Sequence, residues 1–270
     1  MTTKKKKLLI GAIAISTMLA SAGIAIAQIG GTTVTGGSTG SSPAQLSCPG
    51  GIVRLGQVFS ESASVFPGDP VPDINIAFDY VPDFFRLETV FTGTHTGTHL
   101  SAPSHFIAGA TTVDQLPAKD FAWPVYVIDV RSRMANPNFK LSRQDIKNYE
   151  IANGPIPSGA LVALLTGYGS RYGTPAYLDT APGFAAPAID FMFKERFIKG
   201  IGTDTFGPDA TSDTRFAAST AVYANGGITI ENMRGLEQLH INGDIVIAPT
   251  TALLNGSGFL TDPLGCRRAG

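Results

Sequence analysis

The feature that most constrains the fold of this chain is a run of seven residues, Ala160–Thr166, that carries no charge and almost no polarity. A continuous apolar run of this length, closed here by Gly167, is typical of a buried strand. Two further runs, Val125–Val130 and Asp244–Ala248, are also apolar and rich in β-branched residues, and Pro249 ends the second of them. These segments predict strands of a buried sheet.

Helix signals are fewer. Ser142 stands three residues before Asp145, a loose form of the helix-start box, and predicts a helix over the residues that follow. Pro187 suits the first turn of a second helix, and Phe216–Asn225 reads as a third helix that Gly226 ends. The chain also has 31 Gly and 18 Pro, which favour many turns. Strands with interspersed helices predict an α/β or α+β class. The net charge of −1 gives no basic footprint for nucleic acid.

The amino-terminal pattern predicts export. Four lysines, Lys4–Lys7, precede the apolar or small residues Leu8–Ala27, and the small-x-small ending before Gln28 suits a signal peptidase. We therefore expect a signal peptide over residues 1–27, a flexible Gly/Ser/Thr linker over 28–45 and a folded domain over 46–270. The expected location is periplasmic or secreted. The alternative is an uncleaved membrane anchor, because the apolar run is nearly long enough to span a bilayer.

The chain has two cysteines, Cys48 and Cys266, close to the two ends of the predicted domain. In an oxidising compartment such a pair can form a disulfide that ties the termini together, which is the interpretation we favour. The alternative is two unrelated free thiols. No histidine is close to either cysteine in the sequence, so neither is given a catalytic role.

Three of the four histidines, His95, His99 and His105, fall within eleven residues. The residues before them favour an extended strand, on which residues two apart face the same side. His95, Gly97, His99 and Ser101 are therefore expected to share one strand face. Pro103 would end the strand and turn His105 back toward the same place. Neutral imidazole is a common ligand for zinc, and an unligated histidine is a natural proton shuttle, so the cluster predicts a functional site.

The same segment resembles a known family motif. The motif is His-x-Gly-Thr-His-x-Asp-x-Pro-x-His, and this chain has the sequence His-Thr-Gly-Thr-His-Leu-Ser-Ala-Pro-Ser-His over residues 95–105. It is similar to the cyclase family that includes bacterial kynurenine formamidase and isatin hydrolase. Further similar segments follow in the family's order, including Val65–Pro70, Ile156–Gly159, Gly202–Thr205 and Glu231–Leu236. The resemblance covers roughly residues 46–263.

The resemblance implies a fold, an activity and a partner. It implies a swivelling β/β/α cyclase-like single domain, β-rich with a few helices and commonly dimeric, so a homodimer is expected. It also implies a metal-dependent hydrolase that cleaves a C–N bond in a small linear or cyclic amide. His105 matches the family's proton-transfer histidine. The small-molecule substrate itself is not given by the sequence.

Two positions depart from the family pattern. Ser101 replaces the motif's Asp, and Ser219 stands where the family has a metal-binding His twelve residues before Glu231. A neutral hydroxyl is a poorer ligand for zinc or manganese than carboxylate or imidazole. The set that the resemblance still implies is one divalent ion, Zn or Mn, held by His95, His99 and Glu231. His240 has no family counterpart and is interpreted as an ordinary surface or half-buried histidine.

Two function hypotheses remain open at this point. The first is the metal-dependent amide hydrolase, which the retained histidines and Glu231 favour. The second is a family member that has lost metal catalysis and acts as a small-molecule-binding protein or a metal-independent enzyme, which Ser101 and Ser219 favour. A nucleophilic role for Ser101 ranks below both, because its sequence context lacks a nucleophile elbow and an orienting acid.

Overall fold

The computed structural model describes residues 47–136 and 138–270, which belong to one compact unit, Leu46–Gly270. The predicted signal peptide and linker lie outside the described residues, so both stay predictions. Among the described residues, no helix combines the length and the apolar character that crossing a membrane requires.

A mixed nine-stranded sheet forms the frame of the molecule and curls into a half-barrel. The strand order is β1-β13-β11-β5-β7-β9-β10-β4-β12. Its four neighbouring strands β5, β7, β9 and β10 are parallel, and the strands on both flanks pair antiparallel. The strands of this sheet are β1 Ile52–Arg54, β4 His99–Ser101, β5 Ala122–Asp129, β7 Leu161–Leu165, β9 Gly200–Thr203, β10 Ile228–Glu231, β11 Asn242–Ile247, β12 Gly258–Leu260 and β13 Leu264–Cys266. The three sequence-predicted strands are thus confirmed as β5, β7 and β11.

Alternate side chains of the central strands serve two separate cores. In β7, Val162 and Leu164 face the helices, while Leu161, Ala163 and Leu165 face the concave side of the curled sheet. Both sets are nearly inaccessible to solvent. This double burial explains why the β7 segment is apolar throughout rather than alternating.

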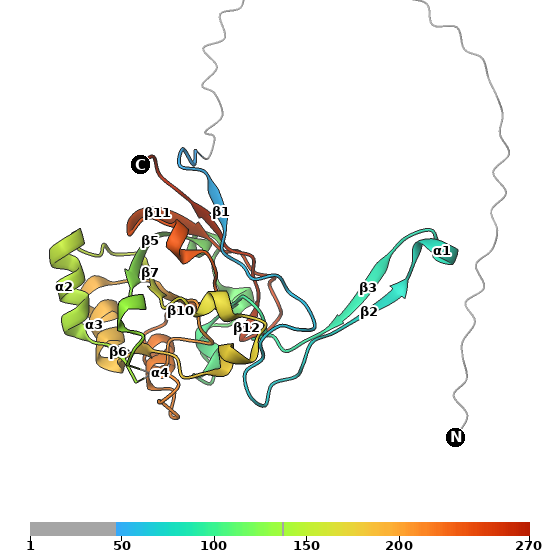
Figure 1. Cartoon of the computed structure of the whole chain (residues 1–270), viewed down its shortest axis with the longest axis horizontal. Helices are drawn as coiled ribbons and strands as arrows, with labels where there is room; N and C mark the ends of the chain where they lie inside the picture. The colour runs from blue at the N-terminus through green and yellow to red at the C-terminus, as the bar shows by residue number, and fades with distance from the viewer. Residues whose placement is uncertain (1–46, 137) are drawn as a thin grey trace, which may run out of the picture. The chain divides into compact units, whose positions relative to one another are not determined.

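Three helices cover the convex face of the sheet (Figure 1). They are α2 Arg143–Asn153, α3 Ala186–Arg196 and α4 Ala217–Ala224, and all three were predicted from the sequence. The α2 start is held by the predicted capping box, in which Ser142 and Asp145 exchange hydrogen bonds with each other's backbone. Pro187 occupies the first turn of α3, where its missing N–H costs nothing.

A two-stranded arm projects from the body (Figure 1). It consists of β2 Asp73–Phe78, the short helix α1 Tyr80–Asp83 and β3 Leu87–Phe91, with the two strands pairing antiparallel. A separate small sheet joins β6 Lys140–Leu141 to β8 Gly183–Phe184. The arm, residues 73–91, carries large apolar side chains that solvent reaches: Ile76, Phe78, Tyr80, Val81, Phe84, Phe85, Leu87, Val90 and Phe91.

The two cysteines form a disulfide between Cys48, just before β1, and Cys266 in β13. Since β1 pairs only with β13 at one edge of the sheet, the bridge fastens that edge strand to its neighbour. The predicted tie between the two ends of the domain is therefore present.

Candidate active site

The histidine motif is placed by a turn, a short strand and a 3-10 helix. His95 lies in a turn, His99 begins β4, and His105 ends the 3-10 helix Pro103–His105. The predicted extended strand through His95 is therefore wrong, because Gly97 has φ = +75° and breaks the strand there. This left-handed backbone suits glycine. A Cβ at Gly97 would also come within 2.9 Å of the Phe59 ring.

The turn nevertheless gathers the imidazoles. The rings of His95 and His105 stack with centroids 3.7 Å apart, and His95 meets His99 edge to face at 5.1 Å. Pro103 reverses the chain as predicted, which brings His105 back over His95. Both ring nitrogens of His95 contact serine hydroxyls: Nδ1 lies 3.0 Å from Ser101 Oγ and Nε2 lies 2.9 Å from Ser257 Oγ.

Glu231 joins the cluster through the sheet. It ends β10 and is the direct antiparallel partner of His99 in β4, so the two side chains meet across the strands. His99 Nδ1 lies 2.9 Å from the Gly97 carbonyl, to which it donates, and Nε2 faces Glu231 Oε2 at 3.4 Å. This Nε2 is buried and makes no hydrogen bond within the described part of the chain. The other carboxylate oxygen accepts from the Thr229 hydroxyl at 2.7 Å.

The electrostatics keep His95 and His105 neutral and the Glu231 carboxylate ionised. Burial, with the neighbouring rings of His99 and His105, lowers the pKa of His95 from its ordinary 6.5 to about 3. Burial also lowers the pKa of His105. Burial alone would raise the pKa of Glu231, but His99 and the Thr229 hydroxyl together hold it below its ordinary value. At neutral pH the site therefore combines the neutral rings of His95 and His105 with one buried negative charge on Glu231.

The predicted metal ligands are not arranged as a metal site needs. The described residues hold no group of three or more His, Cys, Asp or Glu side chains arranged to bind a metal ion. Of the three predicted ligands, His99 and Glu231 face each other, with Nε2 3.4 Å from Oε2, whereas His95 contacts Ser101 and Ser257 through its two ring nitrogens. A catalytic zinc site needs three protein ligands. The three predicted ligands thus lie together, but not as a ligand set.

The remaining predicted positions have other partners. Ser219 lies in the first turn of α4, where its hydroxyl and backbone N–H bond the carboxylate of Asp209. His240 lies outside the cluster, with Nδ1 2.9 Å from Asp244 Oδ1. The interpretation of His240 as a half-buried bystander agrees with this pair.

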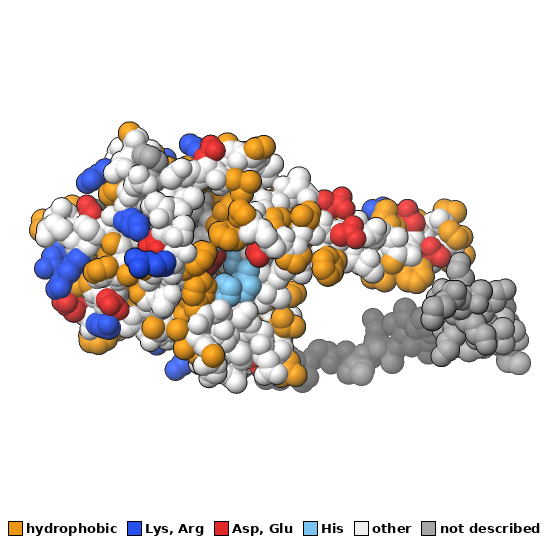
Figure 2. Space-filling view, turned by 90° about the horizontal axis from the view of Figure 1, so that it is seen from below, with side chains coloured by type: hydrophobic (Ala, Val, Ile, Leu, Met, Phe, Trp, Pro, Cys, Tyr) orange, Lys and Arg blue, Asp and Glu red, His pale blue; other side chains and the backbone are white. Residues whose placement is uncertain are grey.

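The cluster lies in a hollow bordered by hydrophobic side chains (Figure 2). Beside it is an aromatic rim of three partly exposed rings, Phe66, Phe106 and Phe216, in which Phe216 contacts Phe66 at 6.0 Å and Phe106 at 5.8 Å between centroids. His105 and Phe106 meet edge to face at 4.9 Å, so the rim continues the wall of the hollow. A flat or apolar group beside the imidazoles would therefore find ring faces to pack against.

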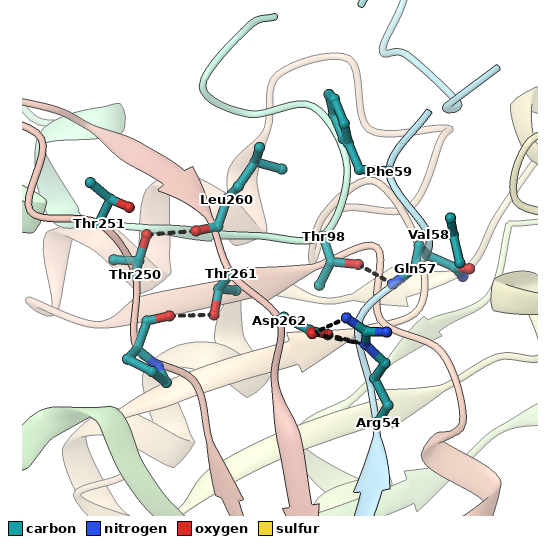
Figure 3. Close-up of a pocket in the computed structure, with 11 residues that line it drawn as sticks. Arg54, Gln57, Val58, Phe59, Thr98, Thr250, Thr251, Leu260, Thr261 and Asp262 are labelled. Carbon is teal, nitrogen blue, oxygen red and sulfur yellow. Dashed lines mark hydrogen bonds and ion pairs between the residues drawn. The ribbon is translucent and has the colours of Figure 1, made fainter. Parts of the chain in front are cut away.

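A separate cavity of about 520 Å³ is lined by Thr98 of the motif and by residues from other segments (Figure 3). The Thr98 hydroxyl accepts from the Gln57 backbone N–H at 2.8 Å, and Arg54 pairs with Asp262 across the cavity wall. None of the imidazoles lines it. The chemistry-bearing groups face the hollow instead, so the hollow is the candidate site.

Sequence reasoning missed two residues of the cluster. Ser257, between two glycines, reaches His95 from 162 residues away, and Tyr223 places its hydroxyl 3.4 Å from Glu231. The flanking Gly256 and Gly258 are the only local signal for Ser257. Tyr223 carries none, since an apolar helix position predicts core.

A curled mixed sheet with a His/Glu cluster at the end of its parallel strands defines the class of protein. A family model described as Putative cyclase matches residues 53–210, which is more than half of the chain. The chain belongs to this cyclase family.

Named relatives give the same picture. The chain is 28% identical over 207 residues to an isatin hydrolase from Roseibium aggregatum, covering 70% of this chain and 78% of the relative. It is 25% identical over 188 residues to a kynurenine formamidase from Bacillus cereus, covering 67% and 81%. Among solved structures, isatin hydrolase A from Labrenzia aggregata bound to benzyl benzoate is 28% identical, with a TM-score of 0.76 over 81% of this chain and 94% of that chain. These relatives are hydrolases of amide C–N bonds.

Proposed function

We propose that this protein hydrolyses an amide C–N bond in a small linear or cyclic amide. The observation that carries the proposal is the convergence of three imidazoles and the Glu231 carboxylate on one hollow. The family membership and the relatives named as amide hydrolases support the reaction class. The aromatic rim of Phe66, Phe106 and Phe216 supports a substrate with a flat apolar part.

In this proposal His105 transfers protons. Its ring is the most solvent-accessible of the three imidazoles and borders the aromatic rim. Its lowered pKa leaves it neutral at pH 7, so it can accept a proton from the reacting groups and release it again. The Glu231 charge lies behind His99, where it favours any positive charge that develops on the rings.

Turnover of isatin, a lactam, and of N-formylkynurenine, a linear amide, tests the function by absorbance. His105→Ala is expected to lower kcat/KM by at least about 100-fold, in line with the loss of a general acid–base. His240→Ala removes an imidazole outside the cluster and should leave kcat/KM within about twofold. Full activity of His105→Ala would remove His105 from the reaction.

We further propose that the purified protein holds no tightly bound divalent ion, because two donors cannot make a zinc site. Elemental analysis after expression with added Zn and Mn should find well under one ion per chain. The matched variant carries Ser101→Asp and Ser219→His, which supplies the two ligand types that the family motif has at these positions. That variant is expected to gain zinc. One ion per wild-type chain, lost in His99→Ala, would restore the metal-dependent interpretation.

A second candidate is a binding protein without turnover. It is favoured by the two hydroxyls that stand at ligand positions, Ser101 and Ser219. Calorimetric titration with the same two amides separates the candidates. Saturable binding without hydrolysis supports the binding protein, whereas hydrolysis that depends on His105 supports the enzyme.

We also propose that the protein is exported and forms a homodimer. The predicted signal sequence and the Cys48–Cys266 disulfide support an oxidising compartment, which fractionation of an expressing bacterium tests. The arm supports a dimer. Its nine apolar side chains expose on the order of 1,000 Å² together, against roughly 800 Å² per partner in a standard interface.

A further inference from the structure

The imidazole of His95 lies between two serine hydroxyls, and this arrangement differs from a metal ligand. Ser101 Oγ is 3.0 Å from Nδ1 and Ser257 Oγ is 2.9 Å from Nε2. Ser101 is fully buried, whereas Ser257 is partly open to solvent. A base held on one side by a buried group and on the other by an accessible hydroxyl is the arrangement of an activated nucleophile.

The buried end of the site has a separate set of hydrogen bonds around Glu231. Glu231 is ionised, so its carboxylate only accepts. The Thr229 hydroxyl donates to it at 2.7 Å, and the Tyr223 hydroxyl lies 2.8 Å from Thr229 Oγ1 and 3.4 Å from Glu231. The single hydroxyl proton of Tyr223 therefore points toward this pair.

The accessible end of the site depends on the tautomer of His95. Ser101 Oγ lies 3.0 Å from Nδ1 and Ser257 Oγ lies 2.9 Å from Nε2, so each ring nitrogen has a hydroxyl partner. With its proton on Nδ1, His95 donates to Ser101 Oγ, and its Nε2 lone pair accepts from the Ser257 hydroxyl. This is the tautomer that a general base needs.

Backbone contacts hold Ser257 in this position. Its carbonyl accepts from the Ala102 N–H at 2.8 Å, and the Gly256 carbonyl accepts from the Val113 N–H at 2.9 Å. A Cβ at Gly258 would come within 2.5 Å of the His95 ring, so glycine is what allows the strand to approach the imidazole. The His105 ring, stacked on the His95 ring, fixes the latter's plane.

We propose that Ser257 is the nucleophile of this site, with His95 as its general base and Ser101 as the positioning residue on the other side of the His95 ring. The inference rests on the proposed hydrolysis. Ser257 Oγ bonds to the carbonyl carbon, and its proton passes to His95 Nε2. That proton then goes to the leaving nitrogen as the C–N bond breaks. Water next adds to the ester, again giving a proton to His95, and releases the carboxylic acid and the free Ser257 hydroxyl.

The test is covalent labelling by diisopropyl fluorophosphate, followed by intact mass and peptide mapping. Attack on phosphorus expels fluoride, so a reactive serine gains one stable adduct without any knowledge of the substrate. We expect one adduct per chain, mapped to Ser257. Ser257→Ala should abolish the adduct, and His95→Gln should slow labelling by at least about 100-fold. Ser62→Ala, an exposed serine outside the hollow, should label like the wild type.

The positioning residue has its own readout. Ser101→Ala should lower the maximal labelling rate by about 10-fold or more while leaving the reagent concentration for half-maximal rate unchanged, because Ser101 acts through His95. Circular dichroism checks that each variant folds. Ser257→Cys gives a second measure, since His95 should make its thiol react with iodoacetamide faster than an unassisted thiol.

The outcomes separate this inference from the proposed function. Amide hydrolysis by Ser257→Ala at the wild-type rate, or an adduct that maps elsewhere, would overturn the nucleophile and leave the hydrolase standing. A Ser257 adduct in a protein that turns over neither amide would support the nucleophile and count against the amide substrate.

Discussion

At the scale of single residues, His95 links the site to the protein's response to acid. Its pKa is about 3 in the folded protein, against 6.5 for an exposed histidine, because burial disfavours the charged ring. Between these two values the unfolded chain binds the proton more tightly. The free energy of unfolding therefore rises with pH over this window, is fully present above pH 6.5, and is lost as the pH falls.

One such group accounts for up to about 2 kcal/mol between pH 7 and pH 5. We expect urea unfolding of the wild type to include a loss of this size from His95, with His105 adding in the same direction. His95→Gln should lose less over the same interval. His240→Gln, which removes a ring outside the cluster, should follow the wild type. Equal pH dependence in His95→Gln and the wild type would mean that His95 stays protonatable when folded.

The members of the cluster were largely predictable from the sequence, but their contacts were not. The motif and the resemblance singled out His95, His99, His105 and Glu231, and the structure brings all four together. What each ring nitrogen faces depends on the packing of distant segments. The partner of His95 Nε2 lies 162 residues away, in a Gly-Ser-Gly stretch without any periodic pattern.

At the scale of elements, the arm makes the sharpest prediction. At the tip of the arm, Val81 is 86% exposed and Phe84 is 93% exposed. Exposing such apolar side chains to water is unfavourable, and a patch of them marks an interaction surface. If a second copy covers the arm, Val81→Asp with Phe84→Asp should weaken the dimer by at least about 100-fold, because each new charge would be buried in the interface. Light scattering after size-exclusion chromatography measures the mass directly.

Ile151→Asp is the matched control for this experiment. Ile151 is 84% exposed as well, but it stands alone on α2, so the charge should leave the dimer intact. A wild-type protein that stays monomeric at high concentration would reject the homodimer and leave the arm for another partner.

Helix α2 offers a smaller, local prediction. Ser142 accepts from the Asp145 N–H at 3.2 Å and Asp145 accepts in turn from the Ser142 N–H at 2.9 Å. Ser142→Ala should lower the free energy of unfolding by about 1 kcal/mol. Ser62→Ala, on an exposed loop, should change it by less than about half of that. Denaturant titration at pH 7 measures both, and equal stabilities would mean that the cap contributes nothing.

Local sequence rules succeeded for α2, β5 and β7 because caps and apolar runs act within a few residues. They failed for the turn that follows β3. The apolar and β-branched residues before His95 favour a strand, as predicted, but the strand belongs to the arm and ends at Phe91. The local sequence does not show whether a strand belongs to the arm or to the main sheet. That depends on which distant segment pairs with it, β2 for β3 and β10 for β4.

At the scale of the whole molecule, the chain closes on itself through β13. This strand pairs with β11 on one side and with β1 on the other, so the first and last strands of the domain are neighbours at one edge. The short strand β1 has three residues and a single partner, which gives it few hydrogen bonds of its own. The Cys48–Cys266 disulfide fastens it there across 218 residues of sequence.

Closing so long a loop removes much of the freedom of the unfolded chain, and the chain-entropy relation gives about 5 kcal/mol for a loop of this size. The double variant Cys48→Ser with Cys266→Ser should therefore lose between about 2 and 5 kcal/mol of unfolding free energy. Urea titration of the variant and of the wild type, each with and without a reducing agent, measures the loss. The reducing agent should lower the unfolding free energy of the wild type to about that of the double variant, and it should leave the unfolding free energy of the double variant unchanged. Four coincident titrations would show that the edge strand holds without its covalent tie, and would remove the support that the bridge lends to an oxidising compartment.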